Sequence, residues 1–96
     1  MMTYVGTYGE LALTDYGNNQ NKLWKVKSNC NKTRIFSTRF DTEGGFDFVT
    51  IDGARFSGVT VLDLMVPNTL FVGFSSDSSS SYSGFVLVWQ CHQLGD

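Results

Sequence analysis

The segment FDFVTIDG, residues 46–53, decides the fold class of this chain. Its first six side chains fall into two alternating sets, as in a β-strand, because successive residues of a strand point to opposite faces. One set is Phe46, Phe48 and Thr50, and the other is Asp47, Val49 and Ile51. The Asp-Gly pair at 52–53 is a strong hairpin-turn signal. We therefore predict a strand over residues 46–51 that ends in a tight turn.

Short strands of the same kind are predicted on both sides of this segment. They lie at 10–13, 23–27, 33–40, 59–65, 69–74 and 85–89, separated by clusters of Gly, Ser, Asn and Asp. In the third of them we expect Phe36, Thr38 and Phe40 on one face, and we expect Pro67-Asn68 to break the chain between two strands. Helical periodicity is almost absent. About eight short strands predict an all-β fold, an antiparallel jelly-roll β-sandwich.

The totals favour one small globular domain over residues 1–96. Hydrophobic residues make up 42% and charged residues 17%, which is typical of a folded chain. The net charge of −2 gives no support for nucleic acid or anionic membranes as partners. No apolar run approaches the length of a membrane span, and no signal peptide is visible at the N-terminus.

The two cysteines permit either one internal disulfide or two buried free thiols. Cys30 and Cys91 are too far apart in sequence for a CxxC redox or zinc motif. We predict the disulfide, because a domain of this size has a thin core and small secreted domains commonly need such a cross-link. Asn31 opens an Asn-Lys-Thr sequon, so it is a possible N-glycosylation site.

Three acidic residues stand at the edges of predicted loops: Glu43, Asp47 and Asp77. Asp47 projects from the face opposite to the two neighbouring phenylalanines, so it can point inward if a partner stabilises its charge. Carboxylates brought together repel one another, and a hard cation such as calcium, which prefers oxygen ligands, stabilises them. The alternative is three separate, solvated carboxylates.

The ordered set of motifs resembles a CUB domain over nearly the whole chain. The matching segments are residues 36–43 (FSTRFDTE), 46–53 (FDFVTIDG), 70–78 (LFVGFSSDS) and 84–89 (GFVLVW), with Tyr16 eight residues before Trp24. The resemblance implies a jelly-roll β-sandwich that serves as an extracellular or cell-surface interaction module, often one of several domains in a larger protein. It also implies a calcium site formed by Glu43, Asp47 and Asp77.

Two further residues acquire roles from the resemblance alone. A backbone carbonyl near Ser79 is the implied fourth calcium ligand, and Tyr16 is the implied tyrosine that orients the acids. The cysteines depart from the family pattern of two local disulfides, because Lys22, Gly44 and Ser57 stand where family cysteines are expected. The chain therefore resembles a divergent member.

Calcium-organised carboxylates predict docking of a protein partner through a lysine or arginine side chain. Two alternatives remain: a carbohydrate-binding, lectin-like module, and a purely structural domain. Lys25 and Lys27 share a strand face, which is either a small site for an anionic partner or simply a solvated face.

We do not expect an enzyme. His92 follows Cys91 directly, and neighbouring residues of a strand point to opposite faces, so the two cannot form the hydrogen bond that a Cys-His nucleophile needs. The sequence also lacks the spacing of a phosphate-binding loop, a zinc site or a GxSxG motif.

Overall fold

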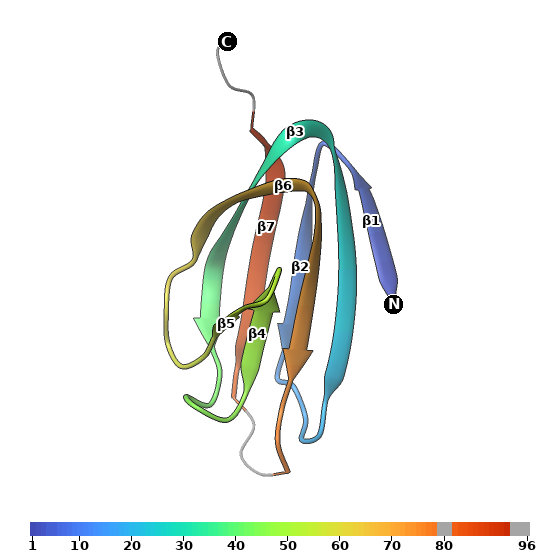
Figure 1. Ribbon diagram of the computed structural model, residues 1–96. Coiled ribbons are helices and arrows are strands. Elements are labelled where there is room, and N and C mark those ends of the chain that lie inside the picture. Colours follow the sequence, from blue (N-terminus) through green and yellow to red (C-terminus); the bar gives the residue numbers. More distant parts are fainter. Residues whose placement is uncertain (79–81, 93–96) are drawn as a thin grey trace.

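The computed structural model describes residues 1–78 and 82–92, which form seven β-strands (Figure 1). In chain order these are β1 (Met2–Gly6), β2 (Tyr8–Thr14), β3 (Asn21–Asp41), β4 (Phe48–Ile51), β5 (Ala54–Phe56), β6 (Asp63–Ser75) and β7 (Gly84–His92). The described part of the chain has no helix long and apolar enough to cross a membrane.

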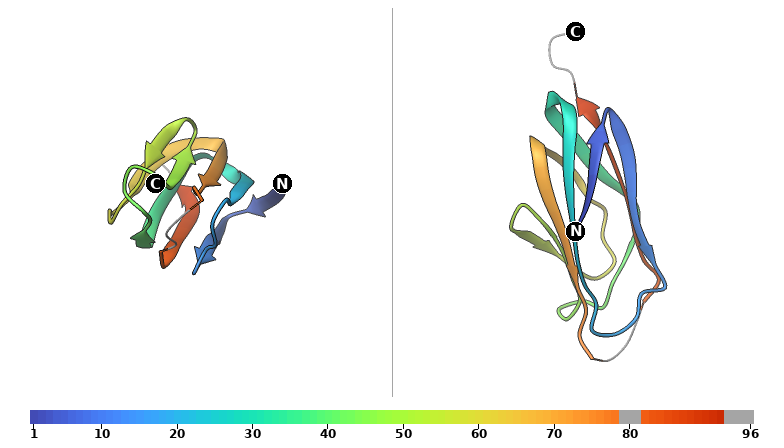
Figure 2. Two further views of the ribbon diagram at one scale, coloured as in Figure 1. Left: turned by 90° about the horizontal axis from the view of Figure 1, so that it is seen from below. Right: turned by 90° about the vertical axis from the view of Figure 1, so that its right-hand side faces the viewer.

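Two long, bent strands fold the sheet into two layers. The strand order is β2-β7-β3-β6-β4-β5, with β1 pairing in parallel with β3. The first half of β3 pairs with the second half of β6, and the register shifts between Lys27 and Lys32, where β3 bends. Beyond the bend, β3 pairs with the first half of β6 on one side and with β7 on the other. Figure 2 shows the resulting layers from the side. The predicted all-β jelly-roll sandwich is confirmed.

Several predicted strand limits are wrong, for reasons that lie in pairing. Pro67 does not end a strand, because β6 runs through it and pairs it with Lys32 at the bend. The predicted strands at 23–27 and 33–40 are two halves of β3. Strand β4 begins only at Phe48, because residues 44–46 form a turn. The edge strand β1 and the three-residue β5 have no clear sequence pattern, and only pairing with their neighbours defines them.

The predicted shared face of Phe36, Thr38 and Phe40 is also wrong. Phe40 is buried, whereas Phe36 lies on the outer side beneath the guanidinium group of Arg34, 4.3 Å from its ring centre. The register shifts between Ser37 and Arg39, so two residues of β3 span one pairing step of β7. Such a β-bulge reverses the alternation of faces, and nothing in the local sequence marks it.

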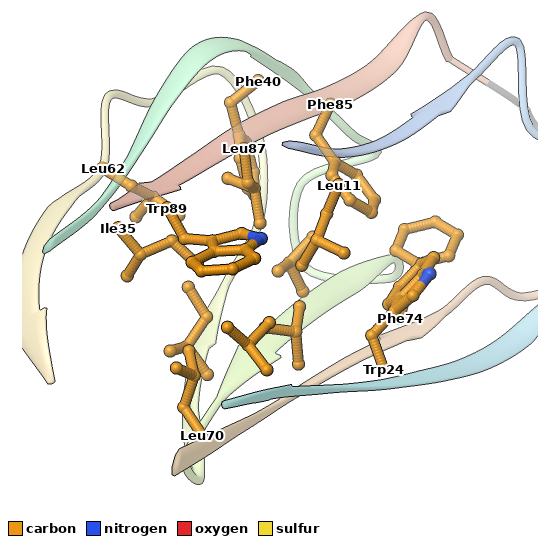
Figure 3. Close-up of a cluster of buried hydrophobic side chains, with 14 of the residues drawn as sticks. Leu11, Trp24, Ile35, Phe40, Leu62, Leu70, Phe74, Phe85, Leu87 and Trp89 are labelled. Atoms are coloured by element: carbon orange, nitrogen blue, oxygen red, sulfur yellow. The ribbon is translucent and has the colours of Figure 1, made fainter. Parts of the chain in front are cut away.

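Aromatic side chains from both layers fill the core (Figure 3). The ring of Phe85 lies 5.3 Å from that of Phe74, 6.0 Å from Trp24 and 6.2 Å from Phe40. This cluster joins β7 to β3 and β6 just inside the end of the sandwich where β3 and β6 finish. It gives the loops at that end a rigid base.

The disulfide lies at the opposite end of the sandwich. Cys30, at the bend of β3, is bonded to Cys91 near the end of β7, with a Cα–Cα distance of 5.6 Å. The predicted pairing is confirmed. Because the Cys91 sulfur is held in this bond, it is not available as a thiolate nucleophile beside His92.

Candidate metal centre

Three loops meet at the end of the sandwich away from the disulfide (Figure 1). They follow β2, β3 and β6, and they carry Tyr16, the pair Glu43 and Asp47, and Asp77. One carboxylate oxygen from each of the three acids lies within 4.8 Å of the others. The structure thus brings together the three acidic residues that the sequence singled out.

A tight turn positions Glu43 and Asp47. The backbone N–H groups of Phe46 and Asp47 both donate to the carbonyl of Glu43, at 3.2 and 3.0 Å. Gly45 occupies the left-handed region, with φ of 82°, which glycine adopts without strain. Its N–H donates to Ser57 Oγ at 3.1 Å, which attaches the turn to the next loop.

Thr42 is a supporting residue that the sequence reasoning missed. Its hydroxyl is buried, donates to the carbonyl of Asp47 at 3.1 Å, and accepts from the N–H of Gly58 at 3.0 Å. Its own N–H donates to the Gly58 carbonyl at 3.1 Å. A threonine in a polar loop gives no sequence signal for such a role, because its partner Gly58 is reached only through the fold.

Asp47 is the centre of the cluster, and it is 0% exposed. Its Oδ2 accepts a hydrogen bond from the Tyr16 hydroxyl, and its Oδ1 accepts one from the Asp77 N–H at 3.0 Å. The Tyr16 oxygen in turn accepts from the Glu43 N–H at 3.2 Å. Tyr16 thus contacts the side chain of Asp47 and the backbone of Glu43, and its ring packs edge-on against Phe74 at 4.7 Å.

The Asp77 loop is held from the other side by the turn after β2. The Asn19 N–H donates to the Asp77 carbonyl at 2.7 Å, and Ser76 exchanges hydrogen bonds with Gln20, at 3.0 Å through its N–H and at 2.8 Å through its hydroxyl oxygen. Asn19 is itself in the left-handed region, with φ of 56°, which asparagine tolerates better than most residues. Backbone bonds therefore fix the position of Asp77 in the cluster.

Burial raises the pKa of the Tyr16 phenol above its ordinary value. The hydrogen bond to Asp47 and the charges of Asp47 and Glu43 raise the pKa further, while the hydrogen bond from the Glu43 N–H lowers it. The phenol therefore stays protonated in the folded state and acts as a donor to Asp47. Because the folded-state pKa is raised, the resulting stabilisation is complete below about pH 10 and is lost as pH rises from there towards the folded-state pKa.

We expect Tyr16→Phe to be less stable than the wild type at pH 7 by about 1–2 kcal/mol, because two polar partners lose their hydrogen bonds. Above about pH 10, Tyr16 ionises in the unfolded wild type, which stabilises the unfolded state. The variant has no ionisable group at this position, so the difference in unfolding free energy between the two proteins should become smaller. Denaturant unfolding at about pH 7, 9 and 10.5 measures both effects. A difference that is constant with pH would contradict the protonated, buried donor.

The donor set fits a calcium ion. Calcium takes six to eight oxygen ligands at about 2.3–2.6 Å, so two oxygens bound to one ion are at most about 5 Å apart. The three carboxylate oxygens lie within 4.8 Å of one another, and all the candidate side-chain ligands are oxygens. The predicted fourth ligand near Ser79 lies outside the described residues.

The sequon residue Asn31 is exposed on β3, and its glycosylation stays a prediction.

Comparison with known proteins gives structural matches only. No family model and no curated protein sequence matches the chain. The chain is similar to the CUB1-EGF-CUB2 region of human MASP-1/3, with a TM-score of 0.83, 16% identity, and coverage of 92% of this chain and 40% of that one. It is similar to the full extracellular region of zebrafish Gpr126/Adgrg6, with a TM-score of 0.83, 23% identity, and coverage of 92% and 14%.

A single-domain structure matches over almost its full length. This is the MASP-1 CUB2 domain bound to Ca2+, with a TM-score of 0.78, 15% identity, and coverage of 93% of this chain and 96% of that one. The chain spans less than half of the length of the MASP-1/3 and Gpr126/Adgrg6 structures. The shared strand arrangement, the full-length structural match and the motif order agree: the chain has the fold of a CUB domain.

Proposed function

We propose that this chain is an extracellular calcium-binding interaction module, which docks a basic side chain of a protein partner on its carboxylate cluster. The observation that carries the proposal is the convergence of Glu43, Asp47 and Asp77 around a fully buried carboxylate. The Ca2+-bound CUB2 neighbour and the disulfide, which is typical of secreted domains, support it. We further propose that residues 1–96 form a single module beside other domains of a larger protein.

Glu43, Asp47 and Asp77 would hold the ion, whose double positive charge would offset their mutual repulsion. Three carboxylates and one divalent ion still leave a net negative charge, so the cluster would attract a cation rather than a phosphate or another acid. Tyr16 and the backbone N–H of Asp77 fix the orientation of Asp47 in advance. A lysine or arginine from a partner would then meet preorganised acceptors, which makes a charge-assisted hydrogen bond strong for its size.

Peptide selection tests the docking function directly. A phage-displayed random peptide library is panned on the immobilised protein with calcium and with a chelator. We expect lysine or arginine to be enriched only with calcium. Asp77→Asn should lose this enrichment, because it removes one charge from the cluster while keeping the loop backbone, and Glu10→Gln, at an exposed carboxylate on β2, should keep it.

Two results would contradict the proposal. If the same peptides were selected with calcium and with the chelator, docking would not depend on the metal. Absence of basic residues from the selected peptides would favour a purely structural domain.

A further inference from the structure

The outer face of one layer carries a shallow hollow that shares no residue with the carboxylate cluster. Cross-strand pairing aligns Leu23 of β3, Gly73 of β6, Thr50 of β4 and Arg55 of β5 in one row. The hollow lies on this row, has a volume of about 220 Å³, and is lined by Asn21, Lys22, Leu23, Thr50, Gly73 and Ser75 among others. Its lining is therefore mixed: hydroxyl and amide groups beside a leucine side chain.

The fold does not require glycine at the centre of this hollow. Gly73 is absent from the positions with positive φ. A Cβ atom built on it would lie 3.7 Å from the Lys22 carbonyl and 3.9 Å from Thr50 Cβ, which is ordinary van der Waals contact. Glycine within a strand weakens it and often marks a bulge, a bend, or a place where a ligand or another backbone approaches. The pairing of Gly73 with Leu23 and Thr50 is regular, so there is no bulge at this position. The missing side chain leaves the hollow open.

Two aromatic rings with cations above them flank the hollow. On one side is Phe71, two residues before Gly73 on the same face, 44% exposed, with Lys25 Nζ 5.9 Å from its ring centre. On the other side is Phe48, two residues before Thr50, with the Arg55 guanidinium 3.7 Å from its ring centre. By strand pairing, two rings and two positive charges thus lie next to the residues that line the hollow.

The positive charges on this face favour a negatively charged ligand. Among the described residues the only ion pair joins Arg34 to Asp63, so neither Lys25 nor Arg55 is paired with a carboxylate there. The acid nearest in the pairing scheme, Asp52, sits in the β4–β5 turn and accepts from the Phe71 N–H at 2.9 Å. The cations therefore remain available to an incoming anion, in contrast to the acidic end of the sandwich.

We propose that this hollow binds one sugar ring of an acidic polysaccharide. Lys25 and Arg55, on opposite sides of the hollow, would each contact a sulfate or carboxylate group of the polymer. Asn21, Thr50 and Ser75 offer hydrogen bonds to the hydroxyls of the ring between them. Phe71, which is 44% exposed, offers apolar surface to a neighbouring ring. Such a combination of apolar surface with a few placed polar groups is typical of a small-ligand site, and the anion gains charge-assisted hydrogen bonds.

Affinity chromatography in the presence of a chelator tests this site separately from the metal centre. The columns carry heparin, which is sulfated, polygalacturonate, which is carboxylated, or dextran, which is neutral. We expect retention on one or both acidic columns and none on dextran. Calorimetry with a hexasaccharide from the retaining polymer then gives the affinity of each variant.

Three variants separate a shaped site from general attraction. Gly73→Val fills the hollow without changing charge, and it should weaken binding by about tenfold or more, or about 1.4 kcal/mol. Lys25→Gln/Arg55→Gln should weaken it at least as much. Lys32→Gln/Arg39→Gln removes the same charge from two exposed residues elsewhere on β3, and it should bind like the wild type.

Several results would overturn the inference. If both double variants weakened binding of the hexasaccharide equally, or if Gly73→Val bound it as tightly as the wild type, binding would reflect general attraction between opposite charges and not a shaped site. Absence of retention on both acidic columns would show that the hollow does not bind acidic polysaccharides. Binding to poly-glutamate that is equally strong and equally weakened by Gly73→Val would favour an acidic protein as the ligand. Since all measurements are made without calcium, these outcomes leave the proposed docking function untouched.

Discussion

Cys30→Ala/Cys91→Ala is expected to lower the free energy of unfolding by about 4 kcal/mol. The two cysteines are separated by 61 positions, so the bond closes most of the chain into one loop and restricts the unfolded state strongly. In a domain whose total stability is on the order of 5–15 kcal/mol, this is a large share. Guanidinium unfolding of the variant and of the oxidised wild type measures the difference.

Reduced wild type is the matched control for this experiment. It retains both side chains but lacks the bond, so its stability should fall close to that of the double variant. A decrease below about 1 kcal/mol would contradict a structural role for the cross-link, given the usual range for native disulfides in small domains.

Calcium is expected to stabilise the wild type but not Asp47→Asn. At a calcium concentration about 100 times the dissociation constant, binding to the folded state alone adds about 2.7 kcal/mol, which corresponds to a rise in Tm of more than about 10 °C for a domain of this size. The substituted asparagine has nearly the same shape as Asp47, and its amide oxygen can still accept from the Tyr16 hydroxyl, while the hydrogen bond from the Asp77 N–H to Oδ1 is lost. It lacks the buried negative charge that would bind the ion.

Thermal unfolding and calorimetric titration, each with and without calcium, measure this effect. Extracellular calcium modules bind with dissociation constants of about 10⁻⁴–10⁻³ M, so titration must extend to tens of millimolar. Glu10→Gln is the control, since it removes an exposed carboxylate outside the cluster. A calcium-dependent rise in Tm that survives undiminished in Asp47→Asn would contradict the need for the negative charge of this aspartate.

The bend of β3 and the end of β7, which carry the disulfide, lie at the opposite end of the sandwich from the loops that carry the carboxylate cluster (Figure 1). The disulfide and the cluster share no residue. Effects of distant sites on stability usually add. The rise in unfolding free energy caused by calcium should therefore be similar in the oxidised and the reduced protein.

The faces of individual strands were predictable wherever the pattern was local. Asp47, Val49 and Ile51 share one face, as the alternation of residues 46–51 predicts, and the structure shows that this face is buried. Two residues of β3, Trp24 and Val26, likewise share a buried face. A strand repeats every two residues, so about six residues suffice to show which side chains share a face. The pattern fails between residues 36 and 40, because the bulge there is a property of pairing with β7.

The candidate site was predictable in its members but not in its geometry. The resemblance to CUB domains supplied Glu43, Asp47, Asp77 and Tyr16, whose types and order are written in the sequence. It could not supply Thr42, nor the exchange of hydrogen bonds between the loops after β2 and β6. Those contacts join residues that are distant along the chain, as with Asp47 and Asp77, 30 positions apart.

The sequence by itself determined the all-β class, which side chains of the clearest strands share a face, the pair of cysteines and the identity of the acidic residues. Only the tertiary structure decided that β3 and β6 bend as continuous strands, that the three acids meet around a buried carboxylate, and that Leu23, Thr50 and Gly73 line one hollow. The physical reason is the same in each case. Alternation and turn chemistry act between near neighbours, whereas register, bulges and loop contacts arise only when distant strands pair.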